Sequence, residues 1–126
     1  EMCIRDRPYI YVRPKPKEHG LGNQIEGAYQ TDNKILVIED LISTGKSSLQ
    51  VVDVLRNAGL NVVGMVSIFN YGFDVAENAF KNAGVPYLSL TNYQSLIELA
   101  VEKGEVDAST QDLLMQWRNS PYTWMQ

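Results

Sequence analysis

Strand-like and helix-like segments alternate along the chain from residue 34 onward, and this alternation constrains the fold more than any other feature. Apolar runs rich in β-branched residues predict strands, and apolar residues spaced three or four positions apart predict helices. The expected strands are 34–38, 60–69 and 85–90, and the expected helices are 47–58, 73–83, 92–103 and 108–118. Asp107 or Ser109 is expected to cap the last helix. Strands joined by helical crossovers form parallel sheets, so the sequence predicts an α/β fold whose first strand is covered on both faces.

The residues before this series predict a less regular region. Residues 8–12 indicate a short strand, residues 13–23 a long loop with two prolines and two glycines, and residues 24–29 a second short strand. Loops of this length without secondary structure are usually functional or disordered. Residues 1–7 are expected to be an unrelated leader. The folded domain is expected to span residues 8–126.

The composition fits one globular domain and excludes several classes of protein. Of the 126 residues, 44% are hydrophobic, and the net charge of −4 does not favour general nucleic-acid binding. The apolar runs are too short for a transmembrane helix, and the single cysteine, Cys3, permits no internal disulfide. We therefore expect a cytoplasmic protein that binds neither nucleic acid nor a membrane. Five of the eleven basic residues lie within the first seventeen, which indicates a local anion site.

The segment I-L-V-I-E-D-L-I-S-T-G-K-S-S, residues 35–48, carries the strongest chemical signal. It continues past the carboxyl end of a predicted strand, where open α/β sheets bind their ligands. Residues 43–47 place backbone N–H groups and hydroxyls at the start of a helix, which suits a phosphate monoester. Glu39 and Asp40 would repel phosphate, but they can accept hydrogen bonds from sugar hydroxyls or hold a divalent cation through water. The segment therefore fits a ribose 5-phosphate.

Two other interpretations of this segment use the same residues. Residues 45–47, G-K-S, resemble the end of a P-loop, but that motif requires a glycine where Asp40 stands. The second interpretation is structural: Ser43 or Thr44 merely caps the following helix.

Two motifs together resemble the type I phosphoribosyltransferases, and among them the orotate phosphoribosyltransferases. Residues 35–48 are similar to the phosphoribosyl pyrophosphate motif, which consists of a hydrophobic strand, two acidic residues and a turn of Thr, Ser and Gly. Residues 13–23, which begin R-P-K-P-K-E-H-G, resemble the mobile loop of the orotate enzymes, whose pattern is R-x-x-x-K-x-H. The resemblance implies that family's parallel sheet flanked by helices, with its N-terminal part missing.

The resemblance also implies a role for each matched residue. The acidic pair would hold the ribose hydroxyls, the turn would hold the 5-phosphate, and the mobile loop would hold the diphosphate. The residues implied to bind phosphoribosyl pyrophosphate are Arg13, Lys17, His19, Glu39, Asp40, Leu41, Ile42, Ser43, Thr44, Gly45, Lys46 and Ser47. Of these, Lys17, His19 and Asp40 are implied to be catalytic, and Ser43 is also implied to contact orotate.

The implied reaction transfers a phosphoribosyl group to N1 of orotate, giving orotidine 5′-phosphate and diphosphate in pyrimidine biosynthesis. Mg²⁺ would accompany the diphosphate, held mainly by the diphosphate and the ribose hydroxyls rather than by protein ligands. The basic loop residues would stabilise charge on the leaving group, and loop closure would exclude water. In this family the loop closes on the neighbouring site of a homodimer.

Three departures from the family pattern bear on this interpretation. Pro14 stands where many members carry a lysine, so one diphosphate contact is missing or comes from Lys15. After the strand at 60–69, many members carry an Asp-Arg pair that meets the orotate carboxylate, but here the sequence is N-Y-G-F-D. Asn70 or Tyr71 could donate a weaker hydrogen bond there, or the aromatic residues form a packing cluster. Finally, the chain matches only a later part of the family, so alone it is expected to be weakly active or inactive.

Three alternatives remain open from the sequence. A phosphoribosyltransferase for another base would carry a different mobile loop. A non-catalytic regulator that binds RNA or a protein would show a basic face and lack the acidic pair. A purely structural α/β fragment would bind no ligand.

Overall fold

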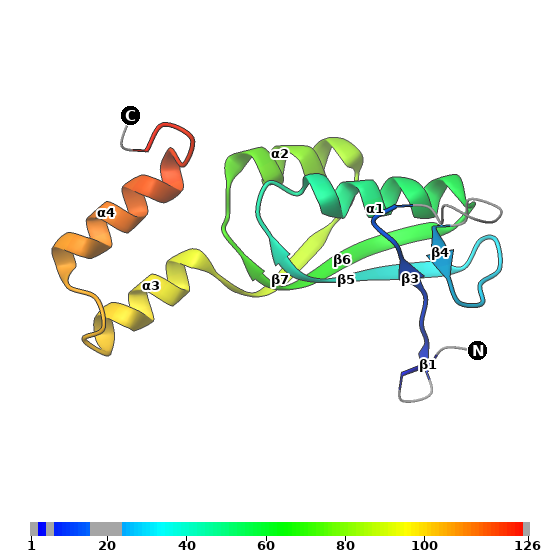
Figure 1. Cartoon of the computed structure of the whole chain (residues 1–126), viewed down its shortest axis with the longest axis horizontal. Helices are drawn as coiled ribbons and strands as arrows, with labels where there is room; N and C mark the ends of the chain where they lie inside the picture. Colours follow the sequence, from blue (N-terminus) through cyan, green and yellow to red (C-terminus); the bar gives the residue numbers. More distant parts are fainter. Residues whose placement is uncertain (1–2, 5–6, 16–23, 125–126) are drawn as a thin grey trace.

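A three-stranded parallel sheet forms the centre of the computed structural model, which describes residues 3–4, 7–15 and 24–124. The strands are β5 (Lys34–Ile42), β6 (Asn61–Asn70) and β7 (Tyr87–Asn92), with β6 in the middle. They are joined by α1 (Lys46–Asn57) and α2 (Asp74–Ala83), which lie together over one face of the sheet (Figure 1). The predicted α/β fold is confirmed.

Two short antiparallel ribbons precede the sheet. β1 (Cys3–Ile4) pairs with β2 (Arg7–Pro8), and β3 (Tyr11–Val12) pairs with β4 (Ile25–Glu26). The predicted short strands are therefore present, but each is only two residues long. Ile25 packs into the main hydrophobic core, so the second ribbon is anchored to the sheet. Most of the predicted mobile loop, residues 16–23, lies outside the described residues.

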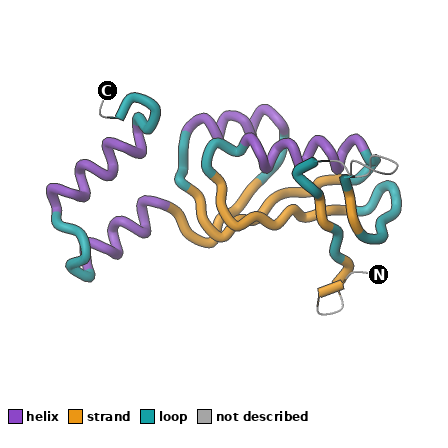
Figure 2. Tube along the Cα trace, viewed as in Figure 1, coloured by secondary structure: helices purple, strands orange, loops and turns teal. Residues whose placement is uncertain are grey.

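A pair of helices follows the last strand. α3 (Tyr93–Glu102) begins directly after β7, and α4 (Ala108–Asn119) returns beside it. Figure 2 shows this pair projecting beyond the end of the sheet, away from the N-terminal ribbons. The Tyr93 hydroxyl donates a hydrogen bond to the Leu114 carbonyl at 3.3 Å, which ties the two helices together. Among the described residues, no helix has the length and apolar character needed to cross a membrane.

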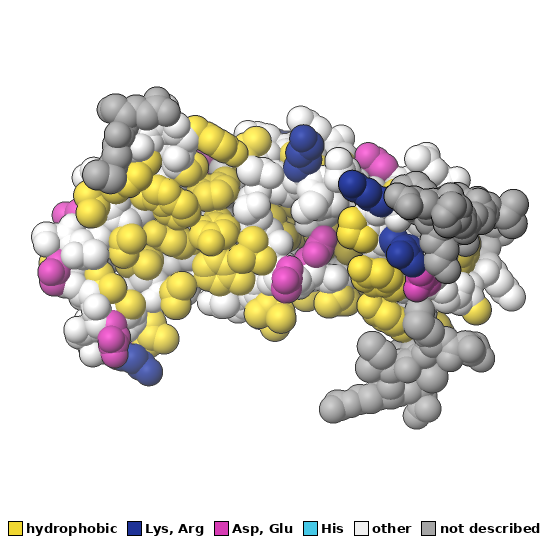
Figure 3. Space-filling model, in the orientation of Figure 1, with side chains coloured by type: hydrophobic (Ala, Val, Ile, Leu, Met, Phe, Trp, Pro, Cys, Tyr) yellow, Lys and Arg dark blue, Asp and Glu magenta, His cyan; other side chains and the backbone are white. Residues whose placement is uncertain are grey.

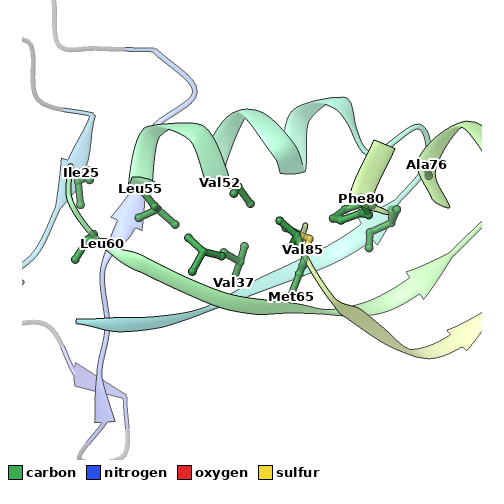
Figure 4. Close-up of a cluster of buried hydrophobic side chains, with 11 residues drawn as sticks. Ile25, Val37, Val52, Leu55, Leu60, Met65, Ala76, Phe80 and Val85 are labelled. Atoms are coloured by element: carbon green, nitrogen blue, oxygen red, sulfur yellow. The ribbon is translucent and has the colours of Figure 1, made fainter. Parts of the chain in front are cut away.

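The hydrophobic core fills the space between the sheet and the two connecting helices (Figure 4). α1 contributes Val52 and Leu55, and α2 contributes Ala76 and Phe80. These positions are three or four residues apart, so each helix turns one apolar stripe towards the strands. Burial of this stripe holds the loops at the strand ends in place.

The opposite face of the sheet is open in the described part of the chain. Ile38, Val66 and Leu88 lie at matching positions on the three strands, and Ile38 and Leu88 are 66% and 65% exposed. The prediction that the first strand is covered on both faces is therefore wrong here. The strand order advances steadily from β5 to β7, so both right-handed crossovers place their helices on the same side.

Candidate functional site

The turn after β5 leads directly into α1, and its backbone packs very closely against α2. Ile42 is fully buried at the end of the strand, and Gly45 precedes α1 with a φ of 77°. A Cβ atom at Gly45 would lie 2.8 Å from Cε2 of Phe80 on α2. Both the left-handed backbone and the lack of space require glycine at this position. Phe80 therefore forms the floor beneath the turn.

The start of α1 has no side-chain cap and no acidic residue in its first turn, among the residues that the structure describes. In contrast, Asn92 caps α3 through the Ser95 N–H, and Asp107 caps α4 through the Thr110 N–H. The structural interpretation that Ser43 or Thr44 caps this helix is therefore wrong, because Gly45 occupies the cap position. Unpaired N–H groups at a helix start, with the positive end of the helix dipole, favour an external anion.

The acidic pair lies inside β5 rather than after it. The predicted strand ended at Ile38, but pairing with β6 continues to Ile42. Glu39 is half-buried opposite Ser67, whereas Asp40 is exposed. Neither carboxylate has a hydrogen-bond or ion-pair partner within the described ranges 3–4, 7–15 and 24–124. Both are thus free to accept hydrogen bonds from a ligand.

The other matched residues of the turn surround this helix start. Ser43 and Thr44 are half-buried, Lys46 and Ser47 are exposed, and Leu41 is exposed at the strand end. The structure therefore brings residues 39–47 together at the carboxyl end of β5. This is the edge at which open α/β sheets bind ligands.

Arg13 lies at the base of the predicted mobile loop and is already paired. Its Nη1 atom lies 2.6 Å from Oε1 of Glu26, and both side chains are partly exposed. The Arg13 backbone N–H also donates to the Gln24 carbonyl at 2.8 Å, which closes the base of the loop. Lys17 and His19 lie outside the described residues, so their predicted roles remain predictions.

The loop after β6 forms an aromatic cluster, as one interpretation of the sequence proposed. The Tyr71 ring stacks on Phe73 at 5.3 Å and meets Phe69, Tyr93 and Trp117 at 5.2 to 5.8 Å. Figure 3 shows hydrophobic side chains gathered where α3 and α4 meet the end of the sheet. Burial, with a smaller contribution from Tyr71, raises the pKa of the Tyr93 hydroxyl.

Two polar residues help to hold this loop. Asn70, a possible donor to a ligand, is buried, and its Oδ1 accepts the Gly72 N–H at 2.8 Å, so its predicted donor role stays a prediction. Arg118, on α4, donates to the carbonyls of Tyr71 and Gly72. Sequence reasoning missed Arg118, because nothing in the sequence places α4 against a loop 46 residues earlier.

The sequence is similar to known orotate phosphoribosyltransferases. That of Bacteroides thetaiotaomicron is 48% identical over 117 residues, which are 93% of this chain and 55% of that protein. The chain spans about half the length of the curated relatives it matches. No family model matches the chain.

The fold is similar to solved structures of the same enzymes. Orotate phosphoribosyltransferase from Aeropyrum pernix matches 73% of this chain and 51% of its own, with a TM-score of 0.64 and 29% identity. The Mycobacterium tuberculosis enzyme in complex with 5-phospho-α-D-ribosyl 1-diphosphate matches 54% of this chain and 41% of its own, with a TM-score of 0.50 and 32% identity.

Proposed function

We propose that the protein containing this chain carries out the reaction of the orotate phosphoribosyltransferases, to which the chain is similar over at least 90% of its own length and about half of theirs. It transfers the phosphoribosyl group of 5-phosphoribosyl 1-diphosphate to N1 of orotate, and it releases orotidine 5′-phosphate and diphosphate. The observation that carries the proposal is the start of α1, which has no side-chain cap, beside two carboxylates that have no partner among the residues that the structure describes. The M. tuberculosis structure, a complex with 5-phospho-α-D-ribosyl 1-diphosphate, supports the choice of donor substrate.

The first turn of α1 is proposed to bind the 5-phosphate. Its free N–H groups donate hydrogen bonds, and the helix dipole adds an attraction of about 0.3–2 kcal/mol for an anion. The hydroxyls of Ser43, Thr44 and Ser47 supply further donors at the same turn. Gly45 keeps this turn in place, because its left-handed backbone and the adjacent Phe80 leave no room for a side chain.

The carboxylates of Glu39 and Asp40 are proposed to accept hydrogen bonds from the ribose hydroxyls. As the diphosphate leaves, positive charge develops on the sugar ring, and nearby carboxylates stabilise that charge. Their function is therefore positioning and electrostatic, without a covalent step. Ser43, next to the buried Ile42, is proposed to contact orotate.

The diphosphate is proposed to be bound by the predicted mobile loop through Arg13, Lys17 and His19, which neutralise charge on the leaving group. Mg²⁺ fits this arrangement as a substrate-held ion, since the carboxylate pair is the only acidic feature that the described residues present at the turn. Bound Mg²⁺ would supply Lewis-acid stabilisation of the diphosphate. We further propose a cytoplasmic homodimer in which the loop of one protomer closes on the site of its partner.

The test is a kinetic assay of the whole protein that contains this sequence, with orotate, 5-phosphoribosyl 1-diphosphate and Mg²⁺. We expect diphosphate release that depends on orotate and is absent with adenine, guanine or uracil. Loss of a hydrogen bond to a charged acceptor costs about 1.5–3 kcal/mol, so Asp40→Asn should lower kcat about 10- to 100-fold.

The matched control is Asp53→Asn, which removes an exposed carboxylate on α1, outside the acidic pair and the turn. It should leave kcat unchanged. Diphosphate release that does not require orotate, or equal effects of the two substitutions, would contradict the proposal.

A further inference from the structure

The loop between β6 and α2 is held by an arginine from the far end of the chain. Arg118 on α4 donates from Nε to the Tyr71 carbonyl at 3.2 Å and from Nη2 to the Gly72 carbonyl at 2.8 Å. A guanidinium donates through several fixed N–H groups, so one side chain can hold two successive carbonyls. α4 is thereby fastened to the edge of the sheet that carries the candidate site.

The four backbone polar groups of Tyr71 and Gly72 all have partners. The Tyr71 N–H donates to the Ile42 carbonyl at 3.1 Å, and the Gly72 N–H donates to Oδ1 of Asn70. Arg118 satisfies the two carbonyls. The loop therefore has one well-defined conformation, and Arg118 supplies half of the hydrogen bonds that define it.

The fit between the arginine and the loop is close on one side and open on the other. Gly72 has a φ of 70°, and a Cβ atom there would lie 3.0 Å from Nη2 of Arg118. On the other side, Gly72, Phe73 and Arg118 line a cavity of about 370 Å³ between the start of α2 and the residues after α4. Because packing does not fill this side, the hydrogen bonds from Arg118 carry more of the loop's rigidity.

The loop adjoins the position proposed for the base. Its hydrogen bond to Ile42 joins it to the residue directly before Ser43, the proposed orotate contact. The side chains of the loop itself offer no cation, since residues 70–73 are N-Y-G-F. Recognition of a carboxylated base at this edge thus depends on how precisely the loop backbone and the turn are placed.

We propose that Arg118 is a positioning residue for base recognition: it holds the Tyr71–Gly72 loop against the end of β5, and so sets the affinity for orotate. This inference rests on the proposed function. Arg118 acts through the loop and takes no part in the chemical step.

The test compares Arg118→Met and Arg118→Lys with the unaltered whole protein in steady-state kinetics. Methionine keeps the apolar stem and removes every donor, so the KM for orotate should rise about tenfold. The KM for 5-phosphoribosyl 1-diphosphate should change less than twofold. Lysine donates to one carbonyl at a time, and it should restore part of the orotate affinity.

Arg56→Met is the matched control, since Arg56 on α1 also donates to a backbone carbonyl, that of Ala83 at 2.9 Å. It removes the same chemistry at a distance from the loop, so it should lower the thermal midpoint without changing either KM. An orotate KM that is unchanged in Arg118→Met, or that rises together with the KM of the other substrate, would overturn the inference. If the unaltered protein releases no diphosphate with orotate, the proposed function is what has failed.

Discussion

At the scale of single residues, Gly45 is the position where the fold tolerates least change. Gly45→Ala adds a methyl group that would lie 2.8 Å from Phe80 in a left-handed backbone. We expect the strained backbone and the overpacking together to lower the free energy of unfolding by about 2–4 kcal/mol. Because the turn must shift, binding of 5-phosphoribosyl 1-diphosphate should also weaken. Urea unfolding and calorimetric titration measure the two effects.

Gly84→Ala provides the control for backbone strain. Gly84 has a similar φ of 62°, but no atom lies within 4 Å of its missing Cβ. This substitution should cost only the strain, about 1–2 kcal/mol, and leave ligand binding unchanged. Equal losses of stability in the two variants would show that the contact with Phe80 is unimportant.

The ion pair between Arg13 and Glu26 leads to a second prediction at this scale. For Arg13 to bind diphosphate it must share or leave Glu26, so Glu26 competes with the ligand. Glu26→Gln should therefore tighten binding of 5-phosphoribosyl 1-diphosphate by about two- to fivefold, as expected for a partly exposed ion pair. Calorimetric titration measures this, with the exposed Glu77→Gln on α2 as the control. Weaker binding would instead mean that Glu26 positions the arginine.

Which of these residues the sequence could reveal depends on how far apart the interacting partners are. Gly45 and the acidic pair were identifiable because a local motif contains them. The floor formed by Phe80 and the clamp formed by Arg118 were not, since both depend on contacts between distant segments. The alternative interpretation, a cap at Ser43 or Thr44, is wrong because Gly45, with its left-handed backbone, occupies the cap position.

At the scale of elements, local sequence patterns predicted each main helix and strand. They misplaced strand ends that depend on hydrogen bonding to a neighbouring strand. α1 begins one residue earlier than expected and α3 begins after its Asn92 cap, both small differences. β5 extends four residues beyond the expected end, because Leu41 and Ile42 pair with Phe69 and Asn70. Pairing with β6 keeps Glu39 and Asp40 within β5. The sequence of β5 alone does not show where this pairing ends.

The cap of α4 makes a prediction about pH. Hydrogen bonds from the Thr110 N–H and the Ser109 hydroxyl lower the pKa of Asp107 below its usual value of 3.8. Because the pKa of Asp107 is lower in the folded state, the charged cap stabilises the protein at any pH above that usual value. This contribution is lost as the pH falls through the lowered pKa. α4 should therefore lose stability on acidification.

The measurement is the thermal midpoint of Asp107→Ala and Asp107→Asn at neutral pH and at about pH 3 or below. Alanine should lower the midpoint at neutral pH, and its difference from the unaltered chain should shrink in acid. Asparagine still accepts the Thr110 hydrogen bond and carries no proton to titrate, so its midpoint should depend less on pH. A difference for alanine that stays constant across this range would contradict the assigned cause.

At the scale of the whole molecule, the uneven coverage of the sheet is the dominant feature. α1 and α2 bury one face, while the open face presents Ile38, Ile68, Leu88 and Leu90, which are 57% to 73% exposed. Parallel sheets are normally covered on both faces, and exposed apolar patches of this kind favour association. We therefore expect the 126-residue chain to self-associate in dilute solution.

Leu88→Lys combined with Leu90→Lys should convert these assemblies largely to monomers, as measured by sedimentation velocity. Both leucines lie on β7 and point away from the core, so the fold should survive the change. Each apolar side chain removed from a contact weakens it by about 1.5–3 kcal/mol, and the introduced charges repel one another. Leu113→Lys, at a leucine on α4 that is 50% exposed, is the matched control and should leave the assemblies intact. If the double variant sediments as assemblies, as the unaltered chain and the Leu113→Lys control do, association does not use the open face. The exposed leucines of β7 then have no role in it.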